Sequence, residues 1–202
     1  REAKKRRKIT NVHIQELSKK VVRITFDSEI ENPKGKIIAH HTTTYTVAGS
    51  GDIIIEVDFE KTVDALPELP RLGMNMHLPR EFDHIQWLGR GPFENYWDRK
   101  AAARVGFYQT MVQDLYYAYI RPQENGNRTD TRWLCLTNKD GIGLLVVGMP
   151  LLSFSAHHHI MEDFESQKKT SAFNENAREI NRHTCDVKPR DLTSLNLDYK
   201  QM

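Results

Sequence analysis

The sequence has too few cysteines to be held together by disulfides. Only two occur among 202 residues, Cys135 and Cys185, and they stand in no C-x-x-C arrangement that could begin a zinc site. An excess of one charge is also lacking, because 29 basic residues face 27 acidic ones and leave a net charge of +2. A field that weak does not favour nucleic acid as a partner.

Long apolar runs are missing as well. The longest, GIGLLVVGMPLL, is far shorter than the roughly 20 residues that a bilayer span needs, and the N-terminus carries no apolar signal region. We therefore expect a soluble chain with no membrane partner. The basic run REAKKRRK has no interleaved aromatics, so we interpret it as a solvated leader into the first strand rather than a phosphate-binding arm. Because the chain begins with Arg1 rather than Met, we expect a piece of a larger protein.

Common catalytic motifs are absent: there is no G-x-S-x-G, no phosphate loop and no H-E-x-x-H. Three consecutive histidines, His157 to His159, suggest a metal site. In a strand, however, only the first and third would share a face, and no nearby carboxylate or cysteine completes the ligand set. We interpret them as part of a half-exposed strand and expect no metal site in the chain.

Alternating β-branched residues dominate what is present. The runs ITNVHIQEL, KKVVRITFDSEI, KGKIIAHHTTTYTVAGSG and DIIIEVDFE predict an antiparallel meander from Lys8 to Phe59. RLGMNMHLP alternates again, NKDG predicts a hairpin turn between two later extended runs, and DLTSLNLDYKQM reads as a last strand. The pattern predicts an all-β chain with one domain over residues 1–202.

Two segments carry weaker signals. The Ala-rich start of AAARVGFYQTMVQDLYYAYIRP predicts a helical turn followed by an irregular aromatic segment. FESQKKTSAFNENAREIN is polar and has no apolar stripe, so we expect a loop with a short surface helix.

Two stretches look unlike the rest, WLGRGPFENYWDRK and YIRPQENGNRTDTRW, and both contain Pro-x-Glu-Asn. Carboxylates and guanidinium groups beside aromatic rings suit the hydroxyls and C–H face of a sugar. The same residues in loops capped by Pro and Gly more commonly bond to their own backbone. A retaining glycosidase would need two carboxyl groups about 5–5.5 Å apart, which the sequence alone does not establish. The candidate loop-network or sugar-facing residues are Glu94, Asn95, Tyr96, Asp98, Arg99, Glu124, Asn125, Arg128 and Arg132.

The two stretches in succession resemble a known family. The patterns W-x-G-x-G-P-x-E-N-Y-x-D-R and P-x-E-N-G-x-R-x-x-x-R follow each other at similar spacing in the C-terminal domain of the large bacterial β-galactosidases of glycoside hydrolase family 2. The likeness extends to GSGDIIIEVDFE and DLTSLNLDYKQM. The resemblance implies a large antiparallel β-supersandwich, similar to the galactose mutarotase superfamily, whose last strands would be missing here.

The resemblance also implies a function. In that family the catalytic glutamates and the Mg and Na sites belong to other domains, so this chain is expected to hold no catalytic residue and no cofactor. It would be a non-catalytic domain of an enzyme that hydrolyses terminal β-D-galactosides, helping to wall the active site and to hold the enzyme together. Its partners would be the remaining domains, with the galactoside bound through the homo-oligomeric parent, in the cytoplasm or periplasm of a bacterium. The family's Thr-Asp-Asn-Asp and Gly-Gly-Asp-x-Ser-Trp stretches, which face the substrate, are not in this sequence.

Two alternatives remain at this point. One is a stand-alone carbohydrate-binding module that uses the aromatic and carboxylate-rich stretches. The other is a mutarotase-like sugar epimerase, in which His157 or His159 would act with a distant glutamate.

Overall fold

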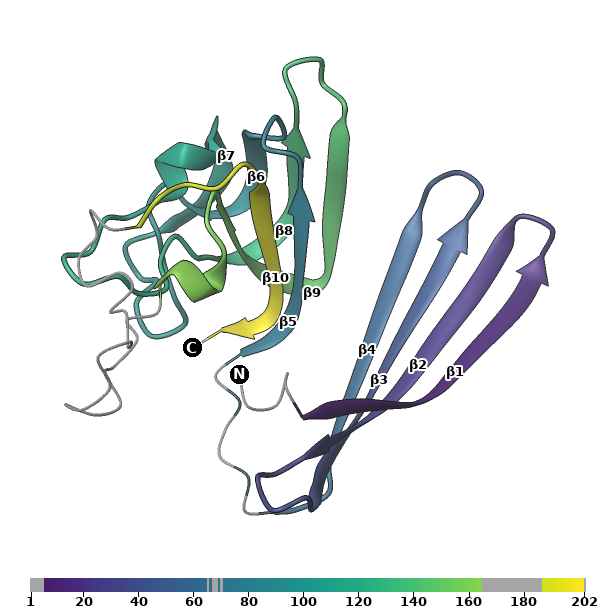
Figure 1. Ribbon diagram of the computed structural model, residues 1–202. Coiled ribbons are helices and arrows are strands. Elements are labelled where there is room, and N and C mark those ends of the chain that lie inside the picture. The colour runs from purple at the N-terminus through teal and green to yellow at the C-terminus, as the bar shows by residue number, and fades with distance from the viewer. Residues whose placement is uncertain (1–5, 65, 67–68, 70, 165–186, 202) are drawn as a thin grey trace. The chain divides into compact units, whose positions relative to one another are not determined.

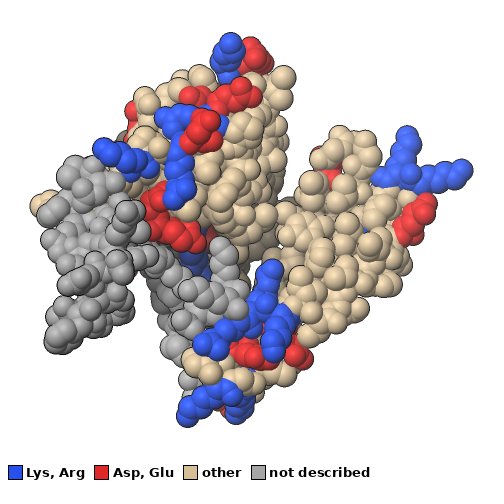
Figure 2. Space-filling view, viewed as in Figure 1, with Lys and Arg blue, Asp and Glu red and all other residues tan. Residues whose placement is uncertain are grey.

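A computed structural model describes residues 6–64, 66, 69, 71–164 and 187–201. The chain divides into two compact units, Arg1–Glu68 and Leu69–Met202, each of which is described by itself (Figure 1). That residues 1–202 form one domain stays a prediction. On the face shown in Figure 2, basic side chains lie beside acidic ones and build no field of one sign. Within the described ranges, no helix combines the length and apolar character that a membrane crossing demands.

The first unit is the predicted meander. Its strands β1 (Arg7–Ser18), β2 (Val21–Glu31), β3 (Ile37–Ala48) and β4 (Ile53–Lys61) form an antiparallel sheet in the order β1-β2-β3-β4. All twelve residues of β1 are exposed. Lys8, the last residue of the basic run REAKKRRK, belongs to β1. Its Nζ lies 2.6 Å from Glu31 Oε1, and its side chain is 66% exposed.

The second unit is a six-stranded antiparallel sheet. Its strands are β5 (Arg71–Leu78), β6 (His84–Gly91), β7 (Arg104–Met111), β8 (Arg128–Thr137), β9 (Gly143–His157) and β10 (Thr193–Gln201), in the order β5-β10-β9-β8-β6-β7. The part of this unit that the structure describes contains two short 3-10 helices, η1 (Val112–Leu115) and η2 (Met161–Phe164). With every paired strand antiparallel and no longer helix among the described residues, the predicted all-β fold class is confirmed.

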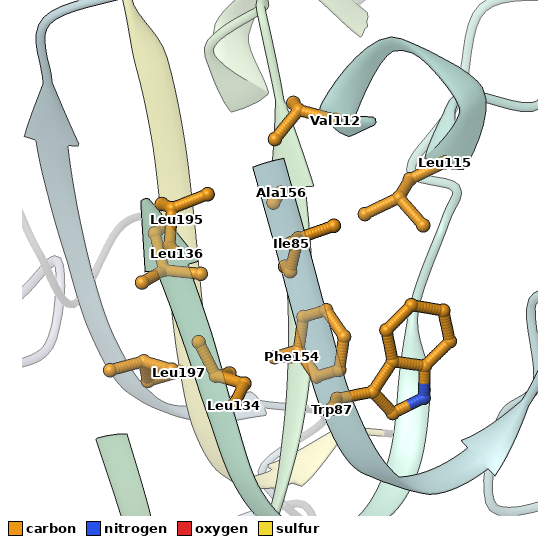
Figure 3. Packing of buried hydrophobic residues seen from close by; sticks show 10 residues of the cluster. All are labelled: Ile85, Trp87, Val112, Leu115, Leu134, Leu136, Phe154, Ala156, Leu195 and Leu197. Carbon is orange, nitrogen blue, oxygen red and sulfur yellow. The ribbon is translucent and has the colours of Figure 1, made fainter. Parts of the chain in front are cut away.

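The apolar core of the second unit lies on one face of this sheet. Alternate residues of four strands meet there with two residues of η1: Ile85, Trp87, Val112, Leu115, Leu134, Leu136, Phe154, Ala156, Leu195 and Leu197 (Figure 3). Trp87 is 1% exposed, and its indole N–H donates to the carbonyl of Arg90 at 3.0 Å. Each large side chain buried in this way contributes about 1.5–3 kcal/mol.

The first six residues of β10, Thr193 to Asp198, are buried on both faces of the sheet. Opposite the core, Asn75 Nδ2 donates to Asn196 Oδ1 at 2.8 Å, and Asn196 Nδ2 donates to Ser155 Oγ at 3.0 Å. Arg71 Nε donates to Asp198 Oδ1 at 2.8 Å. Burial raises the pKa of Asp198 to about 6, because the loss of solvation outweighs the opposing effect of Arg71. The sheet therefore carries a buried polar layer as well as an apolar core.

One part of the secondary-structure prediction is wrong. A turn does occupy residues 101 and 102, but Arg104–Met111 form β7 where an irregular segment was expected. Pairing with β6 along the whole of β7, from His84↔Met111 to Gly91↔Arg104, supplies the backbone bonds that the local sequence did not reveal. The predicted surface helix within FESQKKTSAFNENAREIN lies outside the described residues, apart from Phe164 at its start.

Candidate functional site

The two Pro-x-Glu-Asn stretches meet in space through their asparagines. Loop A (residues 92–103) joins β6 to β7, and loop B (residues 116–127) joins η1 to β8. Asn95 N donates to Asn127 O at 2.8 Å, and Asn127 Nδ2 donates back to Asn95 O at 2.8 Å. Asn95 Oδ1 also accepts from the backbone N and the hydroxyl of Thr129 at 2.9 and 2.7 Å. All three residues are fully buried, so these bonds replace water and fix the two loops against each other.

Glu94 connects loop A to loop B by both of its carboxylate oxygens. Oε2 accepts from Gly126 N at 2.8 Å. Oε1 accepts from Arg99 Nη2 at 3.0 Å and from the hydroxyl of Tyr119. The side chain is only 9% exposed. The carboxylate is therefore occupied by groups of its own loops.

Arg128 bonds to both loops at the same junction. It is 3% exposed, and its guanidinium donates to Gly126 O at 2.6 Å and to Pro92 O at 2.9 Å. Its guanidinium carbon lies 5.7 Å from the centre of the Trp87 ring. Burial lowers the pKa of Arg128 to about 10, and nearby Glu94 opposes that shift. The group is therefore charged at neutral pH and directs that charge at backbone carbonyls.

Asn125 attaches loop B to the end of β9. Its Oδ1 accepts from Tyr117 N at 3.0 Å, its Nδ2 donates to Gln123 O at 3.0 Å, and its backbone oxygen accepts from His157 Nε2 at 2.9 Å. That last bond puts the proton of the imidazole on Nε2. Burial lowers the pKa of His157 to about 4, and the charges that act on it come from His159, Arg128 and His158. His157 is therefore neutral and serves as a support for the loop.

The expectation of a half-exposed histidine strand is wrong. His157, His158 and His159 are 2%, 5% and 9% exposed. The reason is packing: the rings of Tyr116 and Phe164 contact both His157 and His159, with centroids 5.0–6.2 Å apart. Over the ranges that the structure describes, no group of three or more His, Cys, Asp and Glu side chains could hold a metal ion.

A second charged cluster surrounds Asp130, at an irregularity of β8. Asp130 has a φ of 54°, a left-handed conformation that is uncommon outside glycine. Its carboxylate accepts from Arg90 Nε at 2.5 Å and lies 3.2 Å from Lys100 Nζ, and its backbone oxygen accepts from Arg132 Nη1 at 2.5 Å. Burial raises the pKa of Asp130, but the hydrogen bonds from Arg90 and Lys100 outweigh burial, so the pKa lies below its usual value.

The remaining candidates differ in how far they are exposed to solvent. Tyr96 is buried, with the Arg99 guanidinium 4.5 Å above its ring, and burial together with Glu124 and Glu94 raises its pKa. Glu124 is half-buried beside it. Asp98 is exposed at the surface of loop A. The sequence analysis weighed Tyr119 and Asp130 as an aromatic face and a carboxylate but did not list them as candidates, and both belong to the network. The network also contains residues that the sequence did not single out, namely Arg90, Lys100, Asn127 and Thr129. Each lies within or just beside the two motifs, which is the signal that could have found them.

The loops bury several polar side chains and expose four large apolar ones. Phe93, Trp97, Tyr117 and Ile120 are 52%, 47%, 55% and 88% exposed. We call these four side chains the apolar rim. The same loops also expose the polar side chains of Asp98, Arg99, Arg121 and Gln123, so the apolar rim belongs to a surface of mixed composition.

Comparison with known proteins places the chain in a family found in glycoside-hydrolysing enzymes. The chain belongs to the β-galactosidase small chain family, whose model matches residues 1–202. Similar proteins include the β-galactosidase of Priestia megaterium, 33% identical over 159 residues, and that of Pseudoalteromonas haloplanktis, 33% identical over 169 residues. The β-galactosidase of Vibrio cholerae is 35% identical over 153 residues.

These relatives are much longer than the chain. The matches cover 79%, 83% and 75% of the chain but only 14%, 14% and 13% of the relatives from Priestia, Pseudoalteromonas and Vibrio cholerae. The chain therefore corresponds to a small part of each of these β-galactosidases.

Proposed function

We propose that the chain is a non-catalytic domain of a bacterial β-galactosidase that hydrolyses terminal β-D-galactosides. It helps to build the wall of the active site and to hold the multidomain enzyme together. The observation that carries this proposal is the state of Glu94, the best-placed carboxylate of the two motifs: both of its oxygens are bonded to groups of loops A and B.

A catalytic carboxylate must reach the substrate and exchange a proton or form a bond with it. Glu94 could do either only by giving up its bond to Arg99 and the bonds to Gly126 and Tyr119, which connect the two loops. His157 is similarly occupied at Nε2 and is uncharged, which argues against an epimerase that would use it as an acid. The chemistry present supports a structural role better than a catalytic one.

The proposed partners follow from the length of the relatives. Since the chain matches 14% of the Priestia enzyme, catalysis and substrate binding are assigned to the remaining domains of a soluble, homo-oligomeric parent in the cytoplasm or periplasm. Glu94 and Asp130 are engaged by Arg, Lys and backbone donors, and among the described residues no group of three or more His, Cys, Asp and Glu side chains could hold a metal ion. We therefore assign those ions, which the family resemblance implies, to the other domains.

The purified chain tests this proposal directly. We expect no release of nitrophenol from o-nitrophenyl β-galactoside, with an intact β-galactosidase as the positive control and circular dichroism to verify the β fold. The matched variant is Glu94→Gln, which removes the ionisable group and keeps the side-chain shape. Turnover by the folded chain that Glu94→Gln abolishes without loss of the β signal would refute the proposal.

A further inference from the structure

The apolar rim has no explanation in the proposed function so far. Phe93 and Trp97 project from loop A, and Tyr117 and Ile120 project from loop B, so both motifs contribute to it. The rim residues are connected through the network beneath them. Lys100 Nζ lies 4.5 Å from the centre of the Trp97 ring, and the Tyr117 ring lies 4.5 Å from that of Tyr119, which bonds to Glu94.

The backbone that carries the rim is fixed. Asn95 and Asn127 bond reciprocally, Arg128 holds the carbonyls of Pro92 and Gly126, and Asn125 bonds to the end of β9 through its backbone oxygen. Large side chains on a fixed backbone lose little conformational freedom when a partner covers them, which favours binding. Trp and Tyr are also the residues that most often dominate the energy of protein interfaces.

The polar groups of the loops decide what kind of partner fits. A sugar needs open planar donors and acceptors next to the aromatic face that it covers. Here Glu94, Asn95, Asn125 and Asn127 are buried or nearly so and turned toward the loops' own backbone. Of the exposed polar side chains on these loops, Arg99 already donates to Glu94 and Tyr119, whereas Asp98, Arg121 and Gln123 lie at the surface together with the apolar rim. Large apolar and aromatic side chains mixed with charged ones are the usual composition of a protein interface, so the surface suits a protein segment.

We propose that the apolar rim is a docking surface for another part of the β-galactosidase assembly to which the chain belongs. This inference rests on the proposed function. The occupant is an apolar segment of the remaining polypeptide, because the chain matches only 14% of the Priestia and Pseudoalteromonas enzymes and the rest of such an enzyme must contact it somewhere. Exposed large apolar side chains on neighbouring loops are typical of such contacts.

Cysteine accessibility in the complete assembly tests the docking. Trp97→Cys and Tyr117→Cys report on the rim, and Asp140→Cys, in the exposed turn between β8 and β9, is the matched control. We expect maleimide to label positions 97 and 117 at least about tenfold more slowly than position 140, because a covered thiol reacts only when the contact opens. In urea all three should react alike. Equal rates in the native assembly would overturn the inference.

Two further measurements distinguish a protein partner from a carbohydrate at the rim. Hydroxyl-radical footprinting of the unsubstituted assembly measures the native Trp97 without a mutation; its oxidation should be at least about tenfold slower than in urea, and an equal rate counts against docking. Protection that appears only when galactose is added would assign the rim to a carbohydrate and overturn the protein partner. Turnover by the isolated chain would refute the proposed function, whereas the labelling rates would still decide the docking.

Discussion

The two units of the chain use polar side chains in opposite ways. In the four-stranded sheet, β1 is exposed throughout, and its ion pair joins Glu31 to a Lys8 that is 66% exposed. In the six-stranded unit, Arg128, Asn95 and Asp198 are 3%, 0% and 1% exposed. An exposed pair competes with water, whereas a buried group that loses its partner has no substitute. Burial, rather than the number of bonds, therefore sets what each group contributes to stability.

The strongest test of this contrast is Arg128→Ala. It leaves the carbonyls of Gly126 and Pro92 without their donor inside the protein and opens a void against Trp87, so we expect a loss of about 3 kcal/mol in the free energy of unfolding. Urea denaturation followed by tryptophan fluorescence measures it. If the midpoint of Arg128→Ala equals that of Lys8→Ala, the loops are not held by this clamp.

The second test concerns pH and the buried pair of Asp198 and Arg71. The pKa of Asp198 is about 6 in the folded chain and 3.8 for an unperturbed carboxyl, so the folded state binds the proton more tightly. Its contribution to stability is fully present below pH 3.8 and is lost as the pH rises through 6. The shift corresponds to roughly 2–3 kcal/mol.

The variant Asp198→Asn isolates this titration, because it keeps the shape and cannot ionise. We expect the stability of the wild type relative to the variant to decrease between pH 4 and pH 7, as urea midpoints at both values would show. A difference between the two proteins that stays constant, or increases with pH, would contradict the assigned direction.

Arg99→Ala should have an intermediate effect. The side chain of Arg99 is 52% exposed, but its partner Glu94 is 9% exposed and keeps its bonds to Gly126 and Tyr119 after the change. We expect a loss of about 1 kcal/mol, between the values for buried and surface groups. A loss as large as that of Arg128→Ala would mean that Arg99 is as essential as the buried clamp.

The smallest effect is expected for Lys8→Ala. The lysine side of its pair with Glu31 is exposed, and surface ion pairs typically contribute about 0–1 kcal/mol. We therefore expect the free energy of unfolding, measured by urea denaturation, to fall by less than about 0.5 kcal/mol. Repeating the measurement in 1 M salt should remove even that difference, since salt screens exposed charges. A clear loss in high salt would contradict the division between the two units.

Local alternation made much of the fold predictable from the sequence. The meander and β5 follow from it, and the hairpin turn at Asn138 to Gly141 is confirmed: Asn138 Oδ1 accepts from Asp140 N at 3.0 Å, and Gly141 has a φ of 77°. What the sequence could not show depends on distant partners. β7 is stabilised by its pairing with β6, and the ring of Tyr116, which comes from loop B, helps to bury His157 and His159.

The sequence predicted which segments form the candidate site but not how their side chains are arranged. The motifs identified Glu94, Asn95 and Arg128, because polar residues in Gly-Pro loops need partners. They could not separate the exposed Asp98 from the buried Asn127, since both are short polar residues in the same kind of loop. Whether such a side chain points into the protein or into solvent depends on which backbone groups of the other loop lie within hydrogen-bonding distance. The sequence of one loop does not contain that information.

Gly126 constrains the order in which this sequence can change. Its φ is +75°, and a Cβ at this position would lie 2.6 Å from His157 Cε1 and 2.8 Å from the carbonyl oxygen of Leu115. A larger residue at 126 therefore requires both a smaller one at 157 and a shift of η1, while His157 is itself the donor that holds Asn125. A substitution at Gly126 alone would therefore strain loop B. Loop B, η1 and the end of β9 are coupled at this one backbone position.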